Sequence, residues 1–182
     1  MNLLLGFLPF LAFAVVAHVA GTAHGLAAGA LAAFALLVRD AMTGRHIKLL
    51  EIGAAILFGG LALYALRSGP DWSLAHVRLL VDGGLLAIVL ASMLVRMPFT
   101  MQYAAERGAP EAVRHPAFLR KNYVITACWA AAFGVMTLAD IVMENHAKAG
   151  VALTVAALWG AVKFTERYAR ARPVGTVVGV ER

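Results

Sequence analysis

Polar and aromatic side chains recur at intervals of three and four residues along the apolar stretch 121–143. These intervals place them on one face of a helix. The face comprises Asn122, Thr126, Trp129, Phe133, Thr137, Asp140 and Glu144. Amide and hydroxyl groups on such a face most simply hydrogen-bond a neighbouring helix, whereas a carboxyl group among apolar residues needs a partner or water. Asp140 is therefore the candidate on this face for a functional role, for example on a polar path through a small transporter or channel.

The histidines form a second candidate group, because most of them would lie on the outer side of the membrane in the topology given below. These are His18, His24, His76 and His146. Imidazole together with carboxylate can bind a transition metal, and two histidines on different helices can ligate a haem. The sequence has no HExxH motif and no closely spaced His/Cys pair, and histidine is ordinary at a membrane interface. We therefore expect no cofactor, with a metal or haem site as the alternative.

Other catalytic patterns are missing from the sequence. No Ser/His/Asp arrangement, phosphate-binding glycine loop or paired-carboxylate motif is recognisable, so we expect a protein that is not an enzyme. The single cysteine, Cys128, lies in an apolar run and is best explained as a small buried hydrophobe. Gly59 and Gly60 also lie in an apolar run, where close helix contact explains them better than phosphate binding.

The composition indicates that these residues are positioned by membrane-spanning helices. Hydrophobic residues make up 62% of the 182 residues and charged residues 14%, whereas soluble domains have about half and about a quarter. The expected fold is an all-α polytopic bundle that forms a single domain over 1–166, followed by a cytoplasmic tail over 167–182. The apolar runs predict helices at about 3–19, 25–39, 48–66, 79–97, 121–143 and 149–165.

The first two of these helices divide one apolar run that reaches from Leu3 to Val38. A single helix of that length would measure about 54 Å, and the hydrocarbon core of a bilayer is about 30 Å thick. Gly21, Thr22 and Gly25 lie at the midpoint and are compatible with a turn. The run is therefore interpreted as a hairpin of two short helices. Whether this hairpin crosses the membrane completely is left open by the sequence.

The segment 98–121 is the longest connection, and its prolines prevent one continuous helix. Phe99, Met101 and Tyr103 lie beside charged residues there, which predicts a segment lying on the membrane surface. Early in the third helix, Glu51 is expected to form an interfacial ion pair. Its candidate partners are Arg45, Lys48 and Arg96.

The basic residues indicate the orientation of the chain. With both ends cytoplasmic, only Arg67, Arg78 and Lys148 of the 16 Lys and Arg residues lie on the outer side. This asymmetry follows the positive-inside rule, so both termini are predicted to be cytoplasmic. The charges lie between the apolar runs and not along one face, so the pI near 10.0 does not indicate a nucleic-acid partner.

Three short motifs resemble the bacterial intracellular septation protein A family. They are FLPFLAFAVVAHVAGTAHGLAAGALAAF at 7–34, FGGLAL at 58–63, and PEAV at 110–113 followed by Trp129, Phe133 and Asp140. The resemblance covers about residues 7–165 and implies a multi-pass protein of the bacterial inner membrane that contributes to cell division and envelope maintenance. It implies no established catalytic site. The chain departs from the family's usual amide residues near Thr126 and Asp140, which leaves a different activity open.

The leading expectation is a non-enzymatic inner-membrane protein that acts through contacts with other envelope or division proteins. The lipid bilayer and those membrane proteins are the expected partners, and a homo-oligomer is possible on this view. The alternatives are a small transporter or channel that uses the polar face with Asp140, and a membrane metal or haem protein that uses the outer histidines.

Overall fold

The computed structural model describes residues 5–69, 72–106 and 115–171, and the regular secondary structure there is entirely α-helical. The helices are α2 (Leu8–Ala20), α3 (Thr22–Met42), α4 (Leu49–Ser68), α5 (Leu74–Leu94), α6 (Phe99–Ala105), α7 (Pro116–Met143) and α8 (Ala147–Ala171). Among these, α3, α4, α5, α7 and α8 are long and apolar enough to cross a membrane. The expectation of an all-α, multi-pass membrane protein is confirmed.

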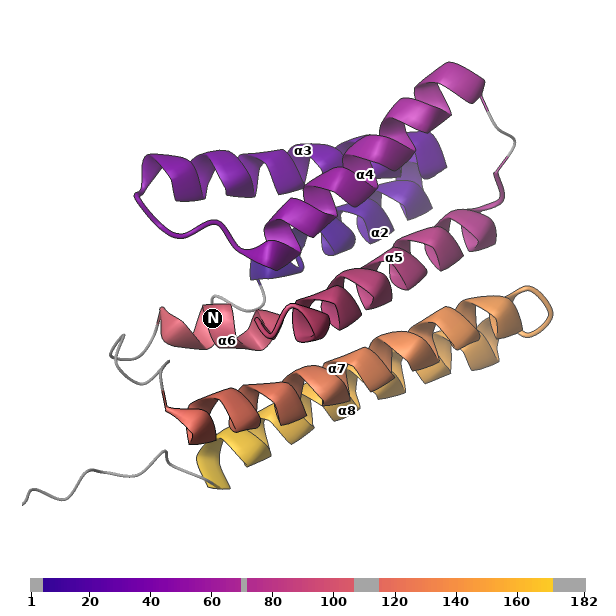
Figure 1. Ribbon diagram of the computed structural model, residues 1–182. Helices are drawn as coiled ribbons and strands as arrows, with labels where there is room; N and C mark the ends of the chain where they lie inside the picture. The colour runs from indigo at the N-terminus through magenta and orange to yellow at the C-terminus, as the bar shows by residue number, and fades with distance from the viewer. Residues whose placement is uncertain (1–4, 70–71, 107–114, 172–182) are drawn as a thin grey trace, which may run out of the picture.

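The long helices run side by side and form two groups (Figure 1). Helix α3 packs against α2 and α4, while α7 packs against α8. Helix α5 contacts both α4 and α7 and so joins the groups. One end of the bundle carries α6, the start of α4 and the start of α7, and is called the α6 end below. The other end carries the last residues of α2, α4 and α7, and is called the turn end (Figure 1).

The predicted hairpin forms at Gly21, which has a φ of 94° and separates α2 from α3. Positive φ of this kind favours glycine. The second helix is not short, however, because α3 has 21 residues and begins at Thr22. His24 lies inside that first turn, where its Nδ1 lies 2.9 Å from the carbonyl oxygen of Ala20. Helix α2 has 13 residues, about 20 Å of helix, and falls short of a full span.

Close helix contact occurs at other glycines than the sequence suggested. A Cβ atom added at Gly25 would lie 2.8 Å from the Cα of Ala17, so α2 and α3 meet backbone to backbone. At Gly59 and Gly60 an added Cβ would have no neighbour within 4 Å in the chain. The interpretation of that pair as a close contact is therefore wrong within this chain, because both glycines lie on an open part of α4.

Local capping moves several helix boundaries away from the predicted ones. Helix α5 begins at Leu74 because the Ser73 side chain accepts a hydrogen bond from the His76 N–H, at 3.2 Å. Helix α7 begins at Pro116, since proline suits the first helical position, where no N–H partner is needed. Helix α8 extends to Ala171, so the first five residues of the predicted tail, 167–171, are helical. The rest of the predicted tail, 172–182, lies outside the described residues.

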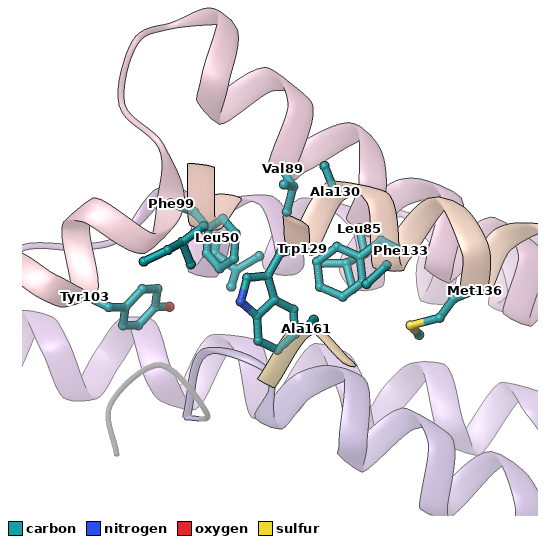
Figure 2. Packing of buried hydrophobic residues seen from close by; sticks show 12 residues of the cluster. Leu50, Leu85, Val89, Phe99, Tyr103, Trp129, Ala130, Phe133, Met136 and Ala161 are labelled. Atoms are coloured by element: carbon teal, nitrogen blue, oxygen red, sulfur yellow. The ribbon is translucent and has the colours of Figure 1, made fainter. Parts of the chain in front are cut away.

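Helix α6 is buried in protein, which corrects the predicted surface segment. Phe99, Thr100, Met101 and Tyr103 are all buried. Phe99 and Tyr103 join a core cluster with residues of α4, α5, α7 and α8, among them Trp129 and Phe133 (Figure 2). Aromatic residues beside charged ones marked the interface in the sequence, but here the aromatic rings enter the core. A second cluster fills the space among α2, α3, α4 and α5.

Candidate functional site

The polar face of α7 is turned inward and is used largely for helix packing. The side-chain amide of Asn122 donates to the Phe118 carbonyl at 2.9 Å. The hydroxyl of Thr126 lies 2.7 Å from that of Thr100 on α6. All three side chains are buried. The Thr126 bond to α6 agrees with the simpler interpretation of that residue as a link between helices. The Asn122 amide bonds within α7, and it is the Asn122 backbone carbonyl that accepts a hydrogen bond from the Thr100 hydroxyl, at 3.1 Å.

The aromatic part of the face bridges α7 to its neighbours. The indole N–H of Trp129 donates to the Thr165 hydroxyl on α8 at 3.0 Å. The Trp129 ring stacks on Phe7 with ring centroids 5.1 Å apart, and Phe133 lies beside both (Figure 2). Thr137 donates to the Phe133 carbonyl at 2.9 Å. These packed aromatic rings are apolar, so they interrupt the row of polar side chains half-way along α7.

Near the turn end, the last two members of the polar face differ in burial. Asp140 is buried, whereas Glu144 is exposed at the C-cap of α7. Glu144 therefore lies outside the interior that holds the other members of the face. Asp140 is the member that has charged neighbours on another helix.

Asp140 contacts two charged residues of α5. Its Oδ1 lies 3.3 Å from the Nε of Arg78, and its carboxyl is close enough to that of Asp82 for the two to interact electrostatically. Neither Asp140 oxygen receives an aligned hydrogen bond from another described donor. Two carboxyl groups can hydrogen-bond each other only when one of them carries a proton. The trio of Arg78, Asp82 and Asp140, called the acid–base trio below, is therefore a place in the bundle that can hold a proton.

A pocket of about 470 Å³ lies beside this trio, among α2, α5, α7 and α8. Its walls are mainly apolar, and they carry the aromatic rings of Phe7, Phe10, Phe13, Trp129 and Phe133. The polar and charged residues on its lining are His18, Arg78, Asp82 and Thr154. The Thr154 hydroxyl is buried without a hydrogen-bond partner in the described structure. An apolar cavity with a few polar groups is the usual form of a small-molecule site.

A separate charged cluster lies at the α6 end around Lys48. The Nζ of Lys48 lies 2.5 Å from Asp40, 2.9 Å from Glu106 and 3.5 Å from Glu51. It also lies over the Tyr103 ring, 5.3 Å from the centroid. The predicted ion pair of Glu51 with Lys48 is confirmed. Asp40 belongs to α3 and not to a loop, and it is buried together with Lys48 and Glu51.

This cluster holds a charged lysine and not a reactive one. Burial alone lowers the pKa of Lys48, but Asp40, Glu106 and Glu51 favour the charged form more strongly, so its pKa lies above its usual value. Burial raises the pKa of the Tyr103 hydroxyl, and the neighbouring carboxylates raise it further. A lysine nucleophile or base needs a lowered pKa. The cluster therefore ties α3, α4 and α6 together.

The four histidines His18, His24, His76 and His146 have different surroundings in the structure. His18 lies on α2 and lines the pocket, while the His24 ring lies against the carbonyl oxygen of Ala20, four residues earlier. His76 stacks on Trp72 with centroids 6.3 Å apart, and His146 is exposed in the turn after α7. In the part of the chain that the structure describes, no group of three or more His, Cys, Asp or Glu side chains is placed to hold a metal ion.

Sequence reasoning did not pair Asp140 with Arg78 and Asp82, the two residues that give it its setting. Arg78 and Asp82 lie four residues apart and therefore share one face of α5. An acid and a base at that spacing inside an apolar run signal a pair that faces the interior. Only the packing of α5 against α7 brings this face to Asp140. Lys48 was missed as a cluster centre because Glu106 is distant from it in the sequence and Asp40, eight residues before it, belongs to the preceding helix.

Comparison with protein-family models, curated proteins and solved structures finds no match to this chain. The resemblance to the septation protein A family rests on the three motifs alone and stays a prediction. One of those motifs, PEAV at 110–113, lies outside the described residues. The chain is a multi-pass helical membrane protein with an aromatic pocket beside a partly buried acid–base trio.

Proposed function

We propose that this membrane protein is a small transporter that binds a small, largely apolar molecule. The aromatic pocket is its binding site. The observation that carries the proposal is the pocket itself: about 470 Å³, aromatic walls, and the charged groups of Arg78 and Asp82 on its lining. Pockets of this size and lining suit ligands of drug size or lipid fragments. The apolar walls would bury most of the ligand, and the charged groups would orient it.

This proposal moves the solute site of the transporter hypothesis from the polar face of α7 to the pocket. The polar face of α7 is a poor path for a solute, because Asn122, Thr126 and Trp129 bond to protein groups and aromatic rings fill its middle. Asp140 keeps a role, since it contacts the two charged residues that lie on the pocket wall. The binding site thus shares Trp129 and Phe133 with the face that the sequence singled out, and its other walls come from α2, α5 and α8.

A saturable photolabelling experiment tests the proposal. The full chain in lipid nanodiscs is exposed to a neutral aromatic diazirine, and labelled peptides are identified by mass spectrometry. Labelling of the peptides that carry Phe13 and Trp129 should saturate, and an excess of the unlabelled parent compound should block it. A Leu158→Trp variant, which fills the pocket, should lose the saturable part. The matched Leu138→Trp variant on the exposed side of α7 should keep it.

Labelling that rises linearly with probe concentration at every peptide would show only partition into lipid and would refute the binding proposal. Equal saturable labelling in the Leu158→Trp and Leu138→Trp variants would place the site elsewhere. Both variants add a tryptophan to an apolar helix, so a difference between them reports the pocket and not the added ring.

A role in septation and envelope maintenance is a second proposal, favoured by the three motifs. The first of them, 7–34, supplies Phe7, Phe10 and Phe13 of the pocket wall. On this proposal the protein lies in the bacterial inner membrane with the α6 end cytoplasmic, and contacts other division proteins or a second copy of itself. Deleting the gene should give long or misdivided cells that wild type rescues. Normal cell length and septum placement in the deletion strain would contradict it.

A further inference from the structure

The charged groups on and directly behind the pocket wall contain more acid than base. Asp82 lies on the lining, and Asp140 lies behind it in contact with both Asp82 and Arg78. Two ionised carboxylates and one guanidinium leave one negative charge uncompensated. Such a charge is costly among apolar walls unless something neutralises it. A proton shared between the two carboxyl groups provides that neutralisation, and it also makes their mutual hydrogen bond possible.

Few other groups face this acid pair. Arg78 comes from the same helix as Asp82, and His18 lines the pocket from α2. The polar residue that α8 contributes to the lining is Thr154, which does not titrate. The Nε of Arg78 faces Asp140, so this charge is already engaged behind the wall. Asp82 is therefore the acid presented to the pocket.

The remaining walls favour a positive ligand over a negative one. The faces of aromatic rings attract cations, tryptophan most of all. Trp129, Phe133 and Phe7 lie within 5.1 to 5.7 Å of one another, measured between centroids, and all three line the pocket. A positive ligand would supply to the trio the one positive charge that the proton otherwise supplies. A negative ligand would add to the excess of acid.

We propose that the pocket binds a lipophilic organic cation in exchange for the proton of the Asp82–Asp140 pair. This inference deepens the proposed function and rests on it. In the step, the O–H bond of the protonated carboxyl breaks, the proton passes to water, and the cation pairs with the carboxylate of Asp82. No bond of the cation changes. The net charge of the site is the same before and after the exchange, so the apolar surroundings carry no added charge.

The test compares two ions of the same shape and opposite charge, tetraphenylphosphonium and tetraphenylborate, in nanodiscs that contain the full chain. Neither ion titrates, so a pH change reports the protein. In weakly buffered solution with a pH-indicator dye, tetraphenylphosphonium should release about one proton per bound ion. Its affinity should rise with pH, by up to about tenfold per unit while the pair holds its proton. Empty nanodiscs supply the correction for partition into lipid.

Variants assign the proton to the acid pair. Asp82→Asn should abolish proton release and weaken tetraphenylphosphonium binding about tenfold or more. Glu144→Gln removes an exposed carboxyl from the same end of α7 and should change neither. If His18→Gln abolishes the release while Asp82→Asn does not, the proton belongs to the histidine and the exchange at the acid pair is refuted. Tighter pocket binding of tetraphenylborate than of tetraphenylphosphonium would refute the preference for a cation.

The outcomes separate this inference from the proposed function. Saturable labelling by the neutral diazirine without proton release by tetraphenylphosphonium would leave a binding pocket and overturn the cation–proton exchange. Loss of both signals would overturn the pocket as a ligand site. Because Asp82→Asn can also disturb folding, the photolabelling of that variant is measured in parallel. Intact saturable labelling with lost proton release is the result that the inference predicts.

Discussion

At the scale of single residues, Lys48 is a buried charged group that depends on several carboxylates at once. Its ammonium group is buried and contacts carboxylates of Asp40, Glu51 and Glu106. Removing one partner of a buried ionic group leaves the others uncompensated, at a cost of about 3–5 kcal/mol. Lys48→Met should therefore lower the free energy of unfolding by about that amount, measured by denaturation with SDS in mixed micelles.

The control for this variant is Lys163→Met. Lys163 forms an ion pair with Glu166 at 3.2 Å, but both side chains are 47% exposed. Exposed pairs contribute about 0–1 kcal/mol, so this variant should unfold almost as the wild type does. Because the folded pKa of Lys48 is raised above 10.5, its contribution should be constant from pH 7 to pH 10 and fall only at higher pH. Equal losses in the two variants would mean that the Lys48 cluster adds no stability.

Trp129 and Thr165 provide a second test at this scale. Their hydrogen bond joins α7 to α8 at 3.0 Å and is partly buried. Trp129→Phe keeps an aromatic ring without the N–H, and Thr165→Val keeps the shape without the hydroxyl. Each change should cost about 1 kcal/mol, and the double variant should cost clearly less than the sum. Additive losses in the SDS unfolding series would show that the bond contributes nothing of its own.

At the scale of helices, the contact of α2 with α3 depends on the absence of a side chain at Gly25. An added Cβ there would lie 2.8 Å from the Ala17 Cα, which is backbone and cannot move aside alone. Gly25→Ala should therefore destabilise the protein and separate the hairpin. Gly60→Ala, at an open position of α4, should be neutral or stabilise by up to about 1 kcal/mol, because alanine favours helix. Thermal unfolding of the purified proteins compares the two variants, and a greater loss for Gly60→Ala would contradict this packing.

The sequence predicted helices better than it predicted their surroundings. The three-and-four spacing along 121–143 correctly indicated one inward face, because helical geometry relates spacing to direction. It could not indicate that Glu144 falls outside the interior, since that depends on where α7 ends against its neighbours. The segment with Phe99 and Tyr103 was predicted to lie on the membrane surface because aromatic residues stand beside charged ones there, and this prediction also failed. Aromatic residues occur both at interfaces and in cores, and only packing separates the two.

At the scale of the whole molecule, the pocket exists because two groups of helices meet there. Its walls combine α2 from one group with α7 and α8 from the other, and α5 supplies Arg78 and Asp82. These walls bring together residues that are far apart in the chain, so neither hydropathy nor periodicity predicts the pocket. The candidate residue Asp140 was found from the sequence, but its partners required the fold.

The orientation of the bundle in the membrane leads to a separate prediction. The positive-inside rule places the α6 end in the cytoplasm and the turn end outside. In a Cys128→Ala background, His146→Cys should react with an impermeant maleimide added to intact cells. Thr43→Cys should react only after the membrane is opened. Equal reaction of both sites in intact cells, or the reverse pattern, would contradict the predicted topology.

The most direct test of the pocket as a ligand site is an experimental structure with an iodinated neutral aromatic compound bound. Iodine scatters anomalously and marks its own position without reference to the protein. The account predicts an anomalous peak inside the pocket, among Phe13, Trp129 and Phe133 and near Asp82. Peaks confined to the outward faces of α3, α4 and α8, with none between the two helix groups, would contradict it.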